Sequence, residues 1–437
     1  MNLFELTLKL TGFPIKEAKE HLQKIQDIPE DKYEVYIKEQ RASIVSFHLE
    51  NNPFYKSFIG EKSVVKWEDI PVMQKKDLQV PLKLRFSKGY SIKDSYINKT
   101  SGSSGHPLIF AKDKYCHALT WSEIIDRFGW HGIDFNKSYQ ARFYGISLDF
   151  LNNKKERLKD FLSHRFRFAI FDLSDELLAS YFEIFKAKKF QYINGYTSSI
   201  VLFAKFLKNK NTVLTEVCPT LKQCVVTSEM LFEKDKQLLE TWLGVPIINE
   251  YGAAELDLIA FTNPKNEFIV NSETLFIEIL DKNNKVLPNG QSGKIVITSL
   301  YNKANPLIRY EIGDTGILSK NSTHKTPILK ELVGRTNDIA KLPSGKIVPG
   351  LTFYYVTKSV IEENGNVKEF IIEQTKIDSF TIIYRSDNEL NSNELNKVKK
   401  ELFNYLESNL ILKFERVTVL KRNKRGKLKQ FVSKINT

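Results

Sequence analysis

A short segment rich in glycine and serine, Thr100–Pro107, carries the clearest chemical signal in this 437-residue chain. Its sequence, TSGSSGHP, supplies two glycines and four hydroxyl groups. Glycine lets the backbone approach a ligand closely, and hydroxyls and backbone amides donate hydrogen bonds to negative charge. The composition therefore predicts a loop that holds the oxygen atoms of a polyphosphate. A flexible linker or a plain hairpin is the alternative for this segment taken alone.

The segment differs from a Walker A phosphate loop, because no Gly-Lys-Ser or Gly-Lys-Thr follows its glycines. Pro107 and an apolar run come next, so the loop does not open a helix. The flanking segments Ser95–Thr100 (SYINKT) and Pro107–Ala111 (PLIFA) both have the composition of strands. The sequence thus predicts a strand–loop–strand hairpin that binds phosphate without a helix dipole.

Four segments downstream of the loop match, in order, the motifs of one enzyme superfamily. They are NEYGAAE (Asn249–Glu255), RYEIGDTG (Arg309–Gly316), GRTNDIAKLPSGKIVP (Gly334–Pro349) and NKRGKLKQ (Asn423–Gln430). Together with the Gly/Ser loop, they resemble the motifs of the superfamily of acyl-CoA synthetases, nonribosomal-peptide adenylation domains and luciferases. Five matches in the family's order are a much stronger signal than any single match.

Longer stretches around these motifs resemble the phenylacetate–CoA ligase-like branch of the superfamily. They include Phe171–Ile200, TSEML (Thr227–Leu231) and ITSLYNKANPLIRYEIGD (Ile297–Asp314). The resemblance is closest to the CapK-type proteins of bacterial surface-polysaccharide clusters, and it covers nearly the whole chain.

The resemblance implies a reaction in which a carboxylate attacks the α-phosphorus of ATP. The products are acyl-AMP and pyrophosphate, and a thiol then displaces AMP. The expected cofactors are ATP, Mg²⁺ and either CoA or phosphopantetheine. The expected partners are a small-molecule carboxylic acid and, for phosphopantetheine, an acyl carrier protein. Because two anions must meet, we expect cations and oriented donors to dominate catalysis.

The resemblance also implies roles for individual residues. Glu255 would bind Mg²⁺ through its carboxylate, and Asp314 would accept the ribose hydroxyls. Tyr251 would lie against adenine. Arg335 would reach the ribose or the phosphates, and Lys427 would bridge the carboxylate and the α-phosphate. Catalysis is therefore expected to rest on Lys427, Glu255 and Arg335.

The complete predicted site is larger than these residues. Asp338 is the predicted hinge about which a small C-terminal domain rotates between the two half-reactions. Nucleotide binding is predicted for Thr100, Ser101, Gly102, Ser103, Ser104, Gly105, Ser228, Glu229, Glu250, Tyr251, Gly252, Ala253, Asp314 and Arg335. The acyl pocket is predicted to be lined by Tyr144, Gly145, Tyr196, Ala253 and Leu256.

The chain departs from the family pattern at several positions. Ala254 replaces a usual threonine or serine, and His106 replaces the common lysine before the proline of the loop. Asn337 replaces the first acid of the hinge motif. The segment Leu342–Gly350 is less apolar than the usual post-hinge loop, which bears on the CoA step. Arg309 could be a ligand or a simple ion-pair partner.

Other functions stay open at this level. The chain could be an adenylyltransferase that releases an adenylated product, or a catalytically inactive scaffold of the same fold. A nucleic-acid-binding protein is suggested by the net charge of +13 and by the basic segments His164–Phe168 and Lys421–Lys429. No zinc-finger, RRM or helix-turn-helix pattern occurs, so we expect no nucleic-acid partner.

The elements that must position these residues follow from hydrophobic periodicity. The first 95 residues read as mainly helical, and residues 174–252 alternate helix and strand, which predicts a mostly parallel sheet covered by helices. From Ile269 the chain becomes β-rich. The last hundred residues mix strands (Phe370–Glu373, Phe380–Tyr384, Arg416–Leu420) with one helix, Asn393–Ser408.

The expected fold class is α/β. A large N-terminal domain (1–337) would hold mostly parallel sheets, covering helices and a β-rich subdomain. A small mobile α+β domain (338–437) would carry the catalytic lysine.

Composition sets further limits. Apolar residues make up 42% and charged residues 27%, as in globular proteins. The three cysteines form no CxxC motif, which argues against zinc and for a reducing, cytoplasmic location. No run of 18 apolar residues occurs, so no membrane span is expected. The acid and the oligomeric state stay undetermined.

Overall fold

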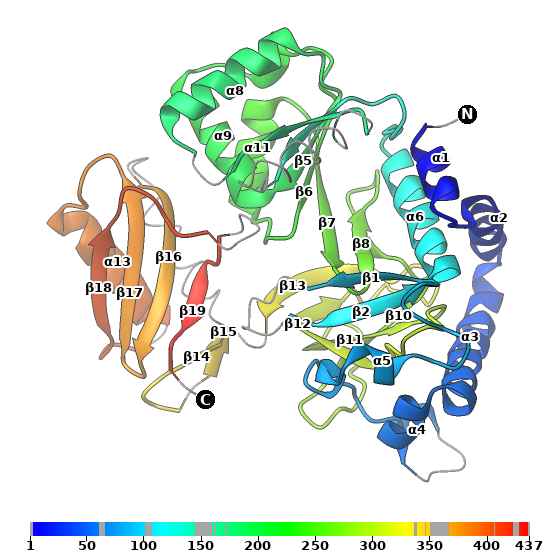
Figure 1. Cartoon of the computed structure of the whole chain (residues 1–437). Helices are drawn as coiled ribbons and strands as arrows, with labels where there is room; N and C mark the ends of the chain where they lie inside the picture. Colours follow the sequence, from blue (N-terminus) through cyan, green and yellow to red (C-terminus); the bar gives the residue numbers. More distant parts are fainter. Residues whose placement is uncertain are drawn as a thin grey trace.

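The computed structural model describes residues 3–60, 66–100, 107–144, 160, 163–170, 173–335, 339–345, 347–349, 367–405, 407–422 and 428–435. The N-terminal part is helical, as predicted. Its helices are α1 (Leu3–Leu10), α2 (Ile15–Gln26), α3 (Glu30–Asn51), α4 (Pro53–Ile59), α5 (Leu82–Arg85) and the short 3₁₀ helices Trp67–Asp69 and Asp77–Gln79. Helices α1 to α4 lie along one side of the large domain (Figure 1).

A seven-stranded sheet with the order β4-β3-β5-β6-β7-β8-β9 forms the centre of the large domain. Its first five strands are parallel, and β8 and β9 are antiparallel additions at one edge. This confirms the predicted mostly parallel sheet. The strands are β3 (Gln140–Phe143), β4 (Arg165–Phe168), β5 (Tyr192–Tyr196), β6 (Gln223–Thr227), β7 (Ile247–Ala253), β8 (Asp257–Thr262) and β9 (Phe268–Val270).

Helices cover both faces of this sheet because its strands are apolar on both sides. One face packs on α8 (Asp175–Ala187), α9 (Thr197–Asn209) and α11 (Glu233–Leu243) through a large hydrophobic cluster. The other packs on α6 (Lys114–Gly129) around Phe128. A short helix, α10 (Leu214–Val217), precedes β6.

Two antiparallel units complete the large domain. The hairpin of β1 (Ser95–Lys99) and β2 (Ile109–Asp113) flanks the Gly/Ser loop. A four-stranded sheet, β10-β11-β12-β13, forms the predicted β-rich subdomain. Its strands are β10 (Leu275–Leu280), β11 (Ser292–Ser299), β12 (Tyr310–Leu318) and β13 (Leu329–Arg335).

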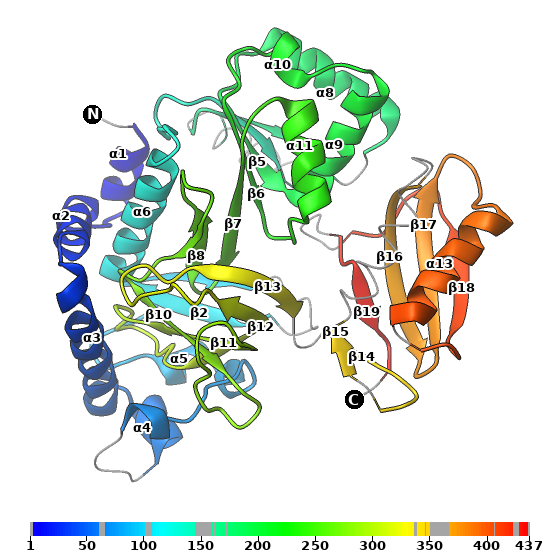
Figure 2. The ribbon, with the colours of Figure 1, turned by 180° about the vertical axis from the view of Figure 1, so that it is seen from behind.

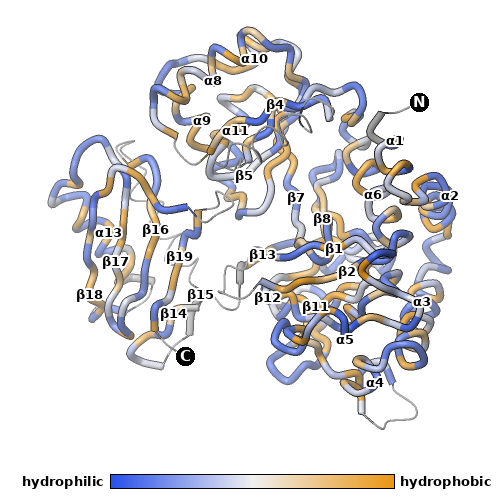
Figure 3. The backbone as a smooth tube through the Cα atoms, viewed as in Figure 1, coloured by the Kyte–Doolittle hydropathy of each residue, from blue (hydrophilic) through white to orange (hydrophobic). Residues whose placement is uncertain are grey.

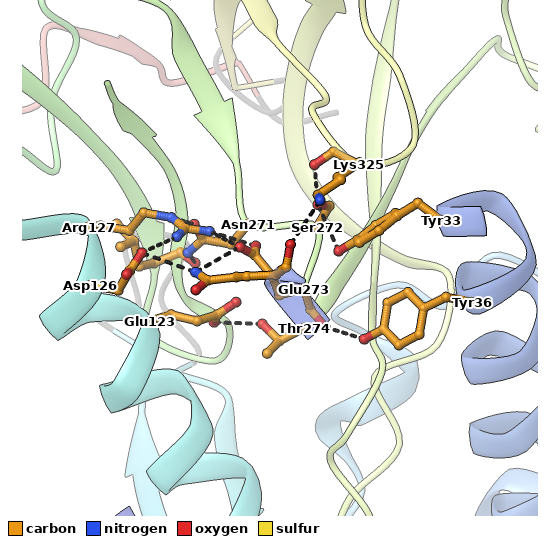
Figure 4. Close-up of polar contacts among 12 residues, drawn as sticks. Tyr33, Tyr36, Glu123, Asp126, Arg127, Asn271, Ser272, Glu273, Thr274 and Lys325 are labelled. Atoms are coloured by element: carbon orange, nitrogen blue, oxygen red, sulfur yellow. Dashed lines mark hydrogen bonds and ion pairs between the residues drawn. The ribbon is translucent and has the colours of Figure 1, made fainter. Parts of the chain in front are cut away.

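A buried polar network joins the helical layer to the sheets (Figure 4). The Arg127 guanidinium donates to both Glu273 oxygens at 2.6 Å and to the Asn271 side chain at 2.8 Å. From α3, the Tyr36 hydroxyl donates to the Glu273 carbonyl at 2.7 Å. From α6, Glu123 accepts from Thr274 at 2.7 Å, and burial raises the pKa of Glu123. The segment 271–274 is thereby tied to α3 and α6.

The C-terminal domain is built on the four-stranded sheet β18-β17-β16-β19. Hydrophobic stretches run along its strands as well as along the sheets of the large domain (Figure 3). Its elements are the β14 (Ile339–Lys341) and β15 (Ile347–Pro349) hairpin, β16 (Val367–Lys376), β17 (Ser379–Ser386), α13 (Ser392–Tyr405), β18 (Ile411–Arg416) and β19 (Phe431–Ser433). The predicted boundary at residue 338 lies outside the described residues.

One predicted strand of this domain is wrong. Strand β18 ends at Arg416, where the prediction placed its start. Strand β17 pairs in parallel with Ile411–Arg416, and Leu412 and Phe414 pack against the domain core. This pairing outweighs the apolar pattern of residues 417–420, whose Leu420 joins a separate cluster with Leu428.

The two domains lie beside each other, with the C-terminal sheet next to α9 (Figures 1 and 2). Within the described residues, none of the helices has both the length and the hydrophobicity of a membrane span.

Candidate nucleotide and acyl site

The base of the Gly/Ser loop is closed by two hydrogen bonds. The Thr100 amide donates to the Leu108 carbonyl, and the Leu108 amide donates to the Thr100 hydroxyl, both at 2.9 Å. The predicted strand–loop–strand hairpin is confirmed. Residues Ser101, Gly102, Ser103, Ser104, Gly105 and His106 lie outside the described residues, so their phosphate-binding role stays a prediction.

A largely buried ion pair joins this hairpin to the start of β8, just after the YGAAE segment. Lys112 of β2 pairs with Asp257, which begins β8, and the Lys112 side chain is only 3% exposed. Sequence reasoning missed this pair because 145 residues separate the partners. Its effect is to hold the β1–β2 hairpin, which carries the Gly/Ser loop, against the hairpin of β7 and β8.

Tyr251 and Asp314 meet directly. The Tyr251 hydroxyl donates to Asp314 Oδ2 at 2.6 Å, and both side chains are buried. Asp314 lies in β12 opposite Arg335 of β13. The structure therefore brings together two predicted nucleotide ligands and the backbone of a third, although they are far apart in sequence. The Arg335 side chain is outside the described part.

Glu255 is buried, and its Oε1 accepts a hydrogen bond from the Tyr310 hydroxyl at 2.9 Å. Among the described residues, no group of three or more acidic, histidine or cysteine side chains could hold a metal ion alone. A single carboxylate fits Mg²⁺ that arrives with a nucleotide, since Mg²⁺ is often held by one or two carboxylates and the substrate phosphates.

Gly252 is required by chain packing at this turn. A Cβ atom added there would lie 2.5 Å from the Asp257 carbonyl oxygen. The β7–β8 hairpin therefore needs glycine at this position whether or not a ligand binds. Ala254, the departure from the family pattern, lies in the same tight turn.

Glu250 faces the opposite side of β7 from Tyr251, because successive strand residues alternate. Glu250 Oε1 accepts from the Thr227 hydroxyl at 2.7 Å. Burial raises the pKa of Glu250, while the Thr227 hydrogen bond and the Arg142 charge act against this rise. The carboxylate of Glu250 thus lies apart from the Tyr251–Asp314 contact.

Two of the predicted acyl-pocket residues are in contact with each other. The rings of Tyr144 and Tyr196 lie 4.6 Å apart, and the Arg142 guanidinium lies 4.2 Å from the centre of the Tyr144 ring. Arg142 was missed by sequence reasoning. Its signal is the alternation in QARF (Gln140–Phe143), which places Arg142 on the sheet face opposite Phe143.

Two further residues of the predicted acyl pocket pack in a different hydrophobic cluster. Leu256 and Ala253 pack in the hydrophobic cluster that contains Tyr251 and Leu108, and not in the cluster of Tyr144 and Tyr196. Gly145 lies outside the described residues. The acyl-pocket role of Ala253, Leu256 and Gly145 stays a prediction.

Ser228 and Glu229 lie at the boundary between the two domains. Glu229 accepts from the Ser198 amide of α9 at 2.7 Å and from the Leu428 amide of the C-terminal domain at 3.1 Å. Lys427 and the hinge residue Asp338 are outside the described residues, so their roles stay predictions.

Three arginines have structural partners. Arg309 is buried, and it pairs with Glu278 at 3.2 Å and donates to the Ile70 carbonyl at 2.7 Å, so the ion-pair alternative holds. Arg165 and Arg167 of the basic segment 164–168 both pair with Asp160, at 2.6 and 2.8 Å. Since these two arginines face a carboxylate, they are not the exposed basic patch that nucleic acid would bind.

Comparison with known proteins bears on this arrangement. No family model matches the chain. The chain is 23% identical over 410 residues to Protein CapK of Staphylococcus aureus, and the alignment covers 88% of this chain and 86% of that protein. Among solved structures, it is similar to 2-hydroxyisobutyryl-CoA ligase in the post-adenylation state with R3-HIB-AMP. The TM-score is 0.70 at 16% identity, and the match covers 94% of this chain and 91% of that one.

The chain has the adenylate-forming ligase fold. The CapK-like resemblance predicted from the motifs is confirmed, and so is the predicted fold class. The same CoA ligase in its thioesterification state has a TM-score of 0.55 at the same coverage. This chain therefore superposes better on the post-adenylation state of that ligase than on its thioesterification state.

Proposed function

We propose that this chain is an adenylate-forming ligase. It uses ATP to convert a small-molecule carboxylic acid to acyl-AMP with release of pyrophosphate. It then transfers the acyl group to the thiol of CoA or of a carrier-protein phosphopantetheine. The observation that supports the proposal is the buried hydrogen bond from Tyr251 to Asp314, which lies opposite Arg335 in the pairing of β12 with β13. It joins two of the residues predicted to bind the nucleotide, and Glu255, predicted to hold its metal ion, is buried at the end of the same segment as Tyr251.

The chemistry suits what this site offers. The acid is already ionised near neutral pH, so the first step needs no general base. The barrier comes from bringing an anion to the charged triphosphate, which donors and cations lower. Asp314, oriented by Tyr251, would hold the ribose. Mg²⁺ bound with ATP would supply positive charge at the phosphates, and Glu255 would hold it.

Lys427 would supply the remaining positive charge at the α-phosphate. Because His106 stands where relatives carry a lysine, the charge of the C-terminal domain matters more in this chain than in those relatives. The acyl group would lie near Tyr144 and Tyr196. We also propose that the enzyme works in the cytoplasm, where ATP and CoA are available. The resemblance to CapK-type proteins supports a role in surface-polysaccharide biosynthesis.

The test is ATP–pyrophosphate exchange with a panel of carboxylic acids. We expect at least one acid to support exchange, and Lys427→Ala to lower the rate about 100-fold or more. Lys429→Ala, an exposed lysine two residues away, is the matched control and should keep the wild-type rate. Near-normal exchange in the Lys427→Ala variant would remove the basis of the proposal. Exchange without consumption of CoA or carrier thiol would instead favour an adenylyltransferase.

A further inference from the structure

The segment after β6 enters the C-terminal domain. Ser228 has a φ of 69°, in the left-handed region that few non-glycine residues adopt, and it turns the chain away from the sheet. Phe232, four residues on, is 6% exposed and belongs to the same hydrophobic cluster as Val367 and Phe370. Met230 packs against that cluster. The sequence TSEMLF (Thr227–Phe232) therefore forms a docking loop between the domains.

Glu229 makes the polar contacts of this docking loop. One carboxylate oxygen accepts from the Ser198 amide in the first turn of α9, at 2.7 Å. The other accepts from the Leu428 amide at 3.1 Å. A carboxylate that accepts two backbone amides forms charge-assisted hydrogen bonds, which are stronger than neutral ones. Leu428 directly follows Lys427 in the sequence, so the contact lies one residue from the predicted catalytic lysine.

A second contact holds the other side of the lysine segment. Arg422 donates to the Ser198 hydroxyl at 3.1 Å and forms an ion pair with Glu369 of β16. The Arg422 side chain is 4% exposed. The residues before and after 423–427 are therefore both tied to the start of α9, through Ser198 and Glu229.

Other polar contacts between the domains involve residues farther along the chain from the lysine segment, such as Arg385, whose side chain donates to the Leu173 carbonyl at 3.0 Å. Lys368 pairs with Asp175 at 2.8 Å, and the Asp175 side chain is 59% exposed. Lys205 donates to the Lys368 carbonyl at 3.0 Å. Exposed ion pairs contribute little because water and salt screen them. The contacts of Glu229 are thus the better candidates for setting where the lysine segment lies.

We propose that Glu229 is a positioning residue that holds the lysine segment for adenylation. In this arrangement its carboxylate binds the Leu428 amide, and it must release that amide before the C-terminal domain turns for thioester formation. The inference rests on the proposed function. It assigns to Glu229 a role at the domain boundary, where the resemblance predicts nucleotide binding. The better superposition of the chain on the post-adenylation state agrees with it.

The first test separates the two half-reactions. Glu229→Ala should lower ATP–pyrophosphate exchange about 10- to 100-fold, the loss expected for charge-assisted hydrogen bonds. Thioester formation from chemically prepared acyl-AMP should stay within about twofold of wild type. The exchange rate of Glu229→Gln should lie between those of wild type and Glu229→Ala, since the glutamine side chain has one acceptor oxygen and the carboxylate has two. Glu233→Ala, an exposed glutamate at the start of α11, is the control. Equal losses in both half-reactions would overturn the positioning role.

The second test needs no substrate, so it separates this inference from the proposed function. Amide hydrogen exchange is measured on the full-length chain without ligand. In Glu229→Ala the Leu428 amide should exchange at least about tenfold faster, while residues 370–374 of β16 keep their protection. Unchanged protection at Leu428 would overturn the inference, even if no acid supports pyrophosphate exchange. Should Glu229→Ala fail to fold, Glu229→Gln carries both tests, with smaller effects in the same direction.

Discussion

At the scale of single residues, the Tyr251–Asp314 hydrogen bond links two motifs that lie 63 residues apart. A buried carboxylate needs donors because burial removes its water. Tyr251 supplies one donor and thereby orients Asp314. A residue predicted to lie against adenine thus has a second role, which is to prepare the carboxylate that would hold the ribose.

Tyr251→Phe removes this donor and keeps the ring. We expect the free energy of unfolding to fall by about 1–3 kcal/mol, because a buried carboxylate loses a partner. We also expect ATP to raise the melting temperature less than in wild type, and the KM for ATP to rise about tenfold. Tyr384→Phe is the control, since its hydroxyl accepts from the Leu390 amide within the C-terminal domain. An unchanged response to ATP in Tyr251→Phe would contradict the assigned role.

At the scale of elements, the site depends on how the β1–β2 hairpin meets the β7–β8 hairpin. Each hairpin forms by local pairing, yet neither alone fixes where the other lies. The Lys112–Asp257 ion pair joins them. Breaking a buried pair costs more than the pair contributes, because a charge is left without a partner.

Asp257→Asn should therefore destabilise the protein by about 3 kcal/mol in urea unfolding, because it leaves the charge of Lys112, whose side chain is 3% exposed, without a partner. Lys112→Met should cost less, since the charge that it leaves on Asp257 is 23% exposed and keeps contact with water. The double variant Lys112→Met/Asp257→Asn should recover part of the loss, because no unpaired charge remains. Additive effects of the two changes would show that the residues do not interact.

At the scale of the whole molecule, two buried histidines couple stability to pH. His48 lies in α3, and its ring makes hydrogen bonds with the Asn302 carbonyl at 2.9 Å and with the Ser87 hydroxyl at 3.3 Å. His117 stacks on Tyr96 of β1 at 3.9 Å. Burial lowers the pKa of each to about 4. Both rings are therefore neutral in the folded protein at pH 5, whereas they are protonated in the unfolded chain.

The direction in which pH changes the stability follows from these pKa values. The unfolded chain takes up protons as the pH falls below about 6.5, and the folded protein does so only near pH 4. Between these values the free energy of unfolding decreases as the pH falls. Each histidine lowers it by about 2 kcal/mol at pH 5 relative to pH 7. We expect the double variant His48→Gln/His117→Gln to lose less stability over this range than wild type.

The measurement is urea unfolding at pH 7 and pH 5, with His324→Gln, an exposed histidine, as the control. Buried carboxyls such as Glu123, whose pKa burial raises, act in the opposite direction. The difference between wild type and the double variant is therefore the relevant quantity. If both proteins lost the same stability between pH 7 and pH 5, the role assigned to the two buried histidines would be wrong.

Much of the fold could be predicted, because helices and strands follow from local periodicity. The hairpin around the Gly/Ser loop and the parallel strands of residues 192–253 are both present. Strand β18 shows the limit, since its position depends on pairing with β17, which lies more than 25 residues earlier. The opposite directions of Glu250 and Tyr251 could also have been predicted, because neighbouring residues of a strand point to opposite faces.

The sequence by itself determined which chemical groups are available and in what order, together with the elements that carry them. These depend on residue type and on contacts with near neighbours. Only the tertiary structure decided that Tyr251 meets Asp314, that Lys112 meets Asp257, and that Glu229 meets Leu428 of the other domain. Such pairs depend on how layers pack and where domains dock. Short-range patterns do not encode these contacts, since the partners are separated by 63 to 199 residues.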